Sequence, residues 1–252
     1  MSEAPRDPMR AAQANMRPAA IKRFYRTVDV REDAGGLHAL TLDGRVARTP
    51  GRRPLAAASR ALMLKVAEEW ERQRETIEPA DMPLTRLVNS AVDGVAFTMA
   101  ETRADVLKYA GSDLLCYRAE EPETLAERQR LAFDPILAWA AEALGARFNL
   151  ATGIMHVEQP PESIEAIRSA IEGFDDPVAL AALSAMTTLS GSAVLALAVA
   201  RGRLSPKEAW RAAHVDEDFE IERWGVDAEA GARRAARWRE FEAAASAAGA
   251  TR

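Results

Sequence analysis

One uncharged stretch, from Val178 to Ala200, constrains the fold of this chain more than any other feature. It is formally long enough to cross a bilayer as a helix. Its middle, however, reads TTLSGS, most of the remainder is alanine, and anchoring aromatic or basic residues do not flank both ends. We therefore expect a central pair of buried helices, broken near Gly191, and no stable membrane insertion. A helical membrane-associated protein is the minor alternative.

The composition also favours a helical globular protein. Of the 252 residues, 53 are alanine, which has the highest intrinsic helix propensity. The formal charge of −5 gives no general attraction to a phosphate backbone, so we expect no nucleic-acid partner. Cys116 is the only cysteine, which excludes an internal disulfide and indicates a reducing compartment.

The N-terminal segment 1–20 carries no apolar core of a secretory signal. Arg6, Arg10 and Arg17 hint at a transit peptide, but Glu3, Asp7 and two prolines argue against one. We expect a disordered N-terminus over 1–20 and a bacterial cytoplasmic location, with an organelle matrix as the alternative.

The β-strands are expected between about residues 23 and 50. Residues 24–30 alternate with a period of two, and Asp43-Gly44 favours a type I′ hairpin, because both central residues of that turn need positive φ. From residue 55 the period becomes helical, with Leu62, Val66 and Trp70 on one face. The fold class is therefore α+β, with a small β-rich N-terminal domain and packed helix over 21–90 and a larger all-α domain over 91–252.

Helix-end signals divide the second domain. Thr98 with Glu101, and Ser205-Pro206 with Glu208, have the capping-box pattern. An N-cap and N1 proline are expected at Asp134-Pro135. Gly225 is expected to close the helix that opens at Ser205. A last helix is expected over about 227–248, and we assign its alanines to helix formation alone.

No catalytic, metal or cofactor-binding residue is expected, and no small-molecule substrate. His38, His156 and His214 have no partner at a recognised metal-ligand spacing. Phosphate-binding glycine motifs and the GxSxG motif are missing from the sequence. Cys116 is expected to be a buried structural thiol. The alternative is an uncharacterised enzyme that uses Cys116 or an acidic pair between the domains.

The segment from Ala212 to Gly225 is the remaining unusual feature. It combines three consecutive acids with two aromatic residues: Asp216, Glu217, Asp218, Phe219 and Trp224. One interpretation is a solvated acidic ridge whose tryptophan is anchored in the core. The other is an acidic patch, edged by aromatic residues, for a protein partner. Both remain open from the residues alone.

Eight ordered blocks of sequence resemble a known family. They are RFYR at 23–26, LDGRVARTP at 42–50, EEW at 68–70 followed by TIEP at 76–79, MPLTRLVNSAVD at 82–93, GSDLLCYR at 111–118, EPETLAERQ at 121–129, FDPILAW at 133–139 and DEDFEIERWG at 216–225. Together they resemble the assembly chaperones of the catalytic head of F-type ATP synthase, specifically the factor that escorts the alpha subunit. The N-terminal segment 1–20 and the alanine-rich tail lie outside the resemblance.

The resemblance implies an ATP-independent chaperone without enzymatic activity. It would bind the newly made alpha subunit and prevent aggregation until the beta subunit replaces it. An important acidic residue of the family maps best onto Glu217, and this chain departs from the family's usual glutamate and tyrosine at Asp218 and Phe219. The resemblance also implies key structural positions at Trp70, Asp113, Tyr117 and Arg118.

Overall fold

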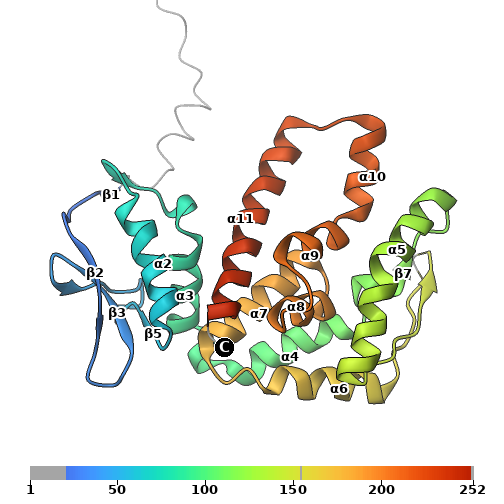
Figure 1. Ribbon diagram of the computed structural model, residues 1–252, viewed down its shortest axis with the longest axis horizontal. Helices are drawn as coiled ribbons and strands as arrows, with labels where there is room; N and C mark the ends of the chain where they lie inside the picture. Colours follow the sequence, from blue (N-terminus) through green and yellow to red (C-terminus); the bar gives the residue numbers. More distant parts are fainter. Residues whose placement is uncertain (1–20, 154, 251–252) are drawn as a thin grey trace, which may run out of the picture.

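The computed structural model describes residues 21–153 and 155–250. The expected disorder of 1–20 lies outside the described residues. Figure 1 shows a small sheet at one end of the long axis and helices over the rest of the molecule. The predicted α+β class, with a small β-containing N-terminal part and a larger helical part, is confirmed. The domain boundary near residue 90 stays a prediction.

The N-terminal sheet is built on the predicted hairpin. Strands β2 (Val28–Glu32), β3 (His38–Leu42) and β4 (Arg45–Val46) are antiparallel neighbours, and β5 (Ala56–Ala57) also pairs with β3. Asp43 has a φ of 48° and Gly44 one of 77°, as the type I′ turn requires. Residues 24–27 are not a strand, contrary to the prediction. The Asp43 carboxylate there accepts the backbone N–H of Thr27 at 2.8 Å.

Helix α2 (Arg60–Glu71) covers the sheet and buries Leu62 and Val66 completely, as their spacing predicted. The chain then forms β6 (Thr76–Ile77), which pairs with β1 (Ile21–Lys22), a short 3₁₀ turn (Pro79–Asp81) and α3 (Pro83–Asp93). The buried Glu69 of α2 accepts the backbone N–H groups of Leu84 and Thr85, each at 2.8 Å. That carboxylate therefore caps α3 and joins the two helices.

The remaining helices form the larger part of the molecule (Figure 1). They are α4 (Met99–Ala110), α5 (Glu123–Trp139), α6 (Pro161–Glu172), α7 (Pro177–Ser190), α8 (Ala193–Ala200), α9 (Pro206–Ala213), α10 (Val215–Trp224) and α11 (Ala228–Ala250). Short 3₁₀ turns lie at Val95–Phe97 and Leu114–Cys116, and a π-helical turn (Ala140–Leu144) extends α5. Strands β7 (Tyr117–Arg118) and β8 (Ala151–Thr152) form a parallel pair.

The uncharged stretch forms the centre of the helical part. It folds as α7 and α8, and the two helices are separated at Gly191, as predicted. Gly191 has a φ of 72°. Every residue of α8 is buried. The Ser192 hydroxyl caps α8 by accepting the N–H of Leu195 at 3.0 Å. Within the described residues, no helix is long and apolar enough to cross a membrane.

Two predicted helix ends were wrong. Helix α5 begins at Glu123 and runs through Pro135, and Asp134 pairs with Arg118 instead of capping. The predicted start of α4 at Thr98 is confirmed, but Thr98 makes no side-chain cap there, and its hydroxyl donates to the Gly94 carbonyl. The helix from Ser205 has the predicted capping box but ends at Ala213, so Gly225 closes α10 instead.

The alanines of the last helix do more than form a helix, contrary to our expectation. Ala243, Ala244, Ala245, Ala247 and Ala248 are buried, and α11 packs against α7. Small side chains on both helices allow the backbones to approach closely. The alanine-rich tail is therefore part of the core.

Candidate partner interface

Helix α10 and the start of α11 form a helical hairpin whose turn lies at the upper right of Figure 1. The three consecutive acids occupy the first turn of α10, where negative charge stabilises a helix. Gly225, with a φ of 84°, ends α10. The Asp227 carboxylate then accepts the N–H of Ala230 at 2.8 Å and opens α11.

The acids of α10 are held by neighbouring helices. Asp216 accepts the side-chain amide of Gln129, from α5, at 2.7 Å. Arg234 of α11 lies 3.6 Å from Glu217 and also pairs with Asp218. Glu217 keeps about half of its side chain exposed, at 49%. These contacts fix α10 between α5 and α11, so the acidic cluster is part of the framework as well as of the surface.

Phe219 points into the structure and is only 6% exposed. The guanidinium of Arg223 lies 4.1 Å from its ring centroid and that of Arg128 lies 5.1 Å away. Arg128 also pairs with Glu222 of α10 at 2.6 Å. Phe219 therefore anchors α10 to α5 and is not available as a surface aromatic.

Trp224 has the opposite environment. It is 84% exposed, so the interpretation that anchors this tryptophan in the core is wrong. Val226 beside it is 63% exposed. The two residues border a groove of about 440 Å³ between α10 and α11, which we call the α10–α11 groove. Exposed aromatic surface next to a groove is typical of a protein-binding site.

The sequence interpretation missed the wall of this groove that α11 supplies. Arg233, Arg234 and Arg237 line it opposite Glu217 and Ile221. Their signal was present in the segment GARRAARWR at 231–239, where Arg233 and Arg237 are four residues apart and therefore share a helix face.

Asp113 is wholly buried and links the turn at Leu114–Cys116 to α8. Its carboxylate accepts the backbone N–H of Leu115 at 3.1 Å and that of Val194 at 3.2 Å. Burial raises the pKa of Asp113 to about 6, although hydrogen bonds from Ser192 and from the backbone oppose the shift. Within the described part of the chain, its hydrogen bonds are all to buried groups, and its structural role stays a prediction.

Arg118 and Tyr117 have structural contacts too. Arg118 donates to the Leu115 carbonyl, pairs with Asp134 at 2.9 Å and lies over the ring of Phe133. The Tyr117 hydroxyl lies 3.3 Å from Nδ1 of His156. Neither residue lies near the α10–α11 groove.

Trp70 lies at the end of α2, far from α10 in the sequence and in the fold (Figure 1). It is half-buried, and its ring centroid lies 5.5 Å from that of Tyr25, whose hydroxyl donates to the Trp70 carbonyl at 2.7 Å. The predicted positions therefore fall into three places: α10, the turn and strand that hold Asp113, Tyr117 and Arg118, and the end of α2.

Cys116 is a buried thiol, as expected. Burial and, secondarily, the neighbouring Asp113 raise its pKa to about 12, so it is not ionised at neutral pH. Across residues 21–153 and 155–250, no three His, Cys, Asp or Glu side chains are placed to hold a metal ion.

Comparisons with known proteins agree on one family. The family model described as ATP12 chaperone protein matches residues 22–141. A crystal structure of a candidate chaperone from Agrobacterium tumefaciens is 46% identical, with a TM-score of 0.90 over 98% of this chain and 92% of that chain. The crystal structure of Atp12 from Paracoccus denitrificans is 40% identical, with a TM-score of 0.85 over 92% of this chain and 99% of that one. The chain therefore belongs to the ATP12 family of chaperones for ATP synthase assembly.

Proposed function

We propose that this chain binds the unassembled alpha subunit of the F1 ATPase and keeps it soluble until the beta subunit takes its place. Membership of the ATP12 chaperone family supports the assembly role. The proposal needs no ATP and no catalysis, because a protein that binds an aggregation-prone surface lowers its free concentration by mass action. The proposed place of action is the bacterial cytoplasm, or the mitochondrial matrix in a eukaryote.

The exposed Trp224 is the observation that carries the proposal. An indole that is 84% exposed leaves a large apolar area in water, and burying that area in a partner would be favourable. Tryptophan is among the residues that most often dominate binding energy at protein interfaces. Trp224 and the α10–α11 groove give an unassembled subunit both an anchor and a cavity.

Charge at the same place would give the contact its orientation. The side chains of Glu217 and Asp218 are 49% and 41% exposed beside the groove, and both form ion pairs with Arg234. Partly exposed charges speed association and set register more than they add affinity. We propose that this acidic surface imitates charges of the beta subunit, which would explain how the beta subunit later replaces the chaperone.

Coexpression with the alpha subunit tests the proposal. The wild-type chain should raise the soluble yield of the alpha subunit and copurify with it. Glu217→Lys should lower both, because it reverses a charge beside the groove and removes the pair with Arg234. The matched control is Glu165→Lys, which reverses an exposed, ion-paired glutamate on α6.

Equal capture by Glu217→Lys and by the wild type would count against the beta-subunit mimicry. Failure of the wild-type chain to copurify with the alpha subunit would reject the proposed partner. Circular dichroism of both variants checks that the fold is intact, so that a loss of capture is not a loss of folding.

A further inference from the structure

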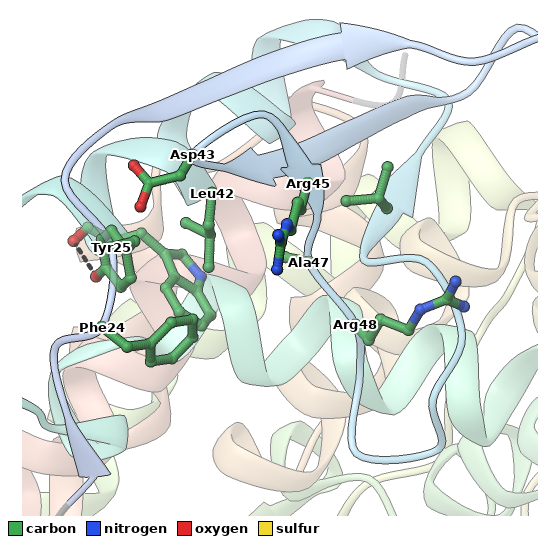
Figure 2. A pocket seen from close by; sticks show the side chains of 9 residues that line it. Phe24, Tyr25, Leu42, Asp43, Arg45, Ala47 and Arg48 are labelled. Carbon is green, nitrogen blue, oxygen red and sulfur yellow. Dashed lines mark hydrogen bonds between the residues drawn. The ribbon is translucent and has the colours of Figure 1, made fainter.

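A second pocket, of about 520 Å³, lies in the N-terminal part of the molecule, away from the α10–α11 groove. We call it the sheet pocket. It is bordered by the start of the described chain, the hairpin of β3 and β4 and the end of α2. Figure 2 shows Phe24 and Tyr25 on one side and Arg48 on the other, with Arg45 between them. The volume is within the range of ligand-binding clefts.

The sheet pocket has an apolar lining and a partly apolar rim. Tyr25, Leu42 and Ala47 are buried beneath it. Phe24 and Val46 at the rim are 67% and 44% exposed. Leaving these side chains in water costs free energy that a ligand would recover by covering them. The pocket is therefore suited to a large apolar side chain.

The aromatic side of the sheet pocket is held in place before any ligand arrives. The Phe24 and Tyr25 rings meet edge to face, with centroids 5.4 Å apart. Tyr25 is fixed from below by its hydrogen bond to the Trp70 carbonyl, and the Arg23 guanidinium lies 4.6 Å from its ring centroid. A preorganised surface loses little conformational entropy on binding.

The polar side of the sheet pocket is positively charged. Arg45 and Arg48 are exposed, and neither has a carboxylate within ion-pair distance among the described residues. Asp43 also lines the pocket, but its carboxylate accepts the backbone N–H groups of Arg26 and Thr27 and the Thr27 hydroxyl. Two guanidiniums therefore outnumber the Asp43 carboxylate, which stays ionised, in the pocket lining. The Arg48 guanidinium also donates to the Arg52 carbonyl at 2.9 Å. The two guanidiniums would pair with carboxylates of a ligand.

The chain's own N-terminal segment, 1–20, does not have this chemistry. Its sequence holds three arginines against Glu3 and Asp7, and it contains no aromatic residue. A net positive segment would be repelled by Arg45 and Arg48. Charge complementarity therefore favours a segment of another protein as the occupant.

We propose that the sheet pocket binds an extended acidic peptide segment of a partner protein, inserting one large apolar side chain between Phe24 and Val46 and placing carboxylates against Arg45 and Arg48. This second docking site is independent of the partner proposed for the α10–α11 groove. A chaperone with two separated docking sites could hold a partner at two points, which raises the effective concentration of the second contact.

The probe for this site is a fluorescein-labelled hexapeptide, Asp-Glu-Leu-Phe-Asp-Glu, titrated with the full chain and followed by fluorescence anisotropy. Its control is Lys-Lys-Leu-Phe-Lys-Lys. The acidic peptide should bind at least about tenfold more tightly than the basic one, and Arg45→Glu should weaken its binding about tenfold or more. Phe24→Ser should weaken it by about fivefold or more through lost apolar contact.

The matched control is Arg31→Glu, which makes the same charge change at an exposed position on β2 of the same sheet. It should change the peptide affinity by less than about twofold. Equal binding of the two peptides, no binding of either, or equal effects of Arg45→Glu and Arg31→Glu would overturn the proposal.

Two further variants locate the peptide. Trp224→Ala should leave peptide binding unchanged. A loss of peptide binding in this variant would show that the peptide occupies the α10–α11 groove instead. Deleting residues 1–20 should also leave the affinity unchanged. An increased affinity would show that the chain's own N-terminus competes for the pocket, which would overturn the assignment of a separate partner.

Discussion

The α7–α8 pair and the α10–α11 hairpin both carry large apolar side chains, but they use them in opposite ways. Every residue of α8 is buried, whereas Trp224 at the end of α10 and Val226 in the turn after it are 84% and 63% exposed. The uncharged α8 has no side chain that water could solvate, so burial is its only stable arrangement. The difference teaches that a buried apolar side chain is explained by packing, whereas an exposed one, such as Trp224, points to a binding function.

Ion pairs explain how the hairpin can leave Trp224 exposed. Two ion pairs, Glu222 with Arg128 and Asp218 with Arg234, hold helix α10 against its neighbours. The buried Phe219 supplies its apolar anchor. The fold of this region therefore does not depend on Trp224. A side chain that the fold does not need is free to bind a partner.

The same contrast divides α11. Its first half carries arginines that face the groove, and its last turns bury alanines against α7. One helix thus joins the proposed binding surface to the core. A change in the core half should alter stability, and a change in the outer half should alter binding.

The largest effect on stability is expected in α8. Leu195→Ala removes a fully buried side chain from a closely packed centre, and we expect the free energy of unfolding to fall by about 3 kcal/mol. Urea denaturation measures it. The control is Leu131→Ala on α5, where the side chain is 62% exposed and the loss should stay below about 1 kcal/mol. Similar losses for the two variants would break the comparison.

Asp113, buried against the start of α8, should give a pH dependence. Its pKa is about 6 in the folded chain and 3.8 when unperturbed, so between these values the folded state binds more protons than the unfolded state. Its contribution to the free energy of unfolding is therefore full below about pH 4 and is lost as the pH rises through about 6.

The difference in unfolding free energy between the wild type and Asp113→Asn isolates that contribution. As the pH rises from 4 to 7, the unfolding free energy of the wild type should fall by roughly 1–3 kcal/mol relative to that of Asp113→Asn. Denaturation curves of both proteins across this range measure it. A difference that does not change with pH would show that Asp113 stays charged in the folded state.

The smallest effect on stability is expected at the exposed end of α10. Trp224→Ala should change the free energy of unfolding by less than about 0.5 kcal/mol, because the side chain is in water in the free protein. The same denaturation experiment measures it. A loss comparable to that of Leu195→Ala would mean that Trp224 packs inside the molecule, and the two regions would no longer differ.

The sequence predicted best those features that depend on neighbouring residues. Asp43-Gly44 fixes its own turn, and Gly191 separates α7 from α8 wherever these helices pack. Asp134 shows the limit of such local prediction. The dipeptide Asp134-Pro135 is typical of a helix N-cap, but in the structure Asp134 lies within α5 and pairs with Arg118. A local signal loses when a more distant contact is more stable.

The candidate site was predicted only in part. The acids of α10 are visible as a run in the sequence, but their pairing with Arg234 depends on how α11 folds back. Phe219 and Trp224 are five residues apart on a short helix, and nothing local decides that one is buried and the other exposed. Burial of the last alanines likewise depends on α7 as the neighbour.

Capture of the alpha subunit by Trp224→Ala is the most direct test of the central claim. Tagged wild type, Trp224→Ala and the exposed-residue control Leu131→Ala would each be coexpressed with the alpha subunit, and the copurified subunit quantified. We predict that Trp224→Ala recovers at least about tenfold less alpha subunit than the wild type, while Leu131→Ala recovers as much. Equal recovery by all three would contradict the claim that the α10–α11 hairpin is the surface that binds the partner.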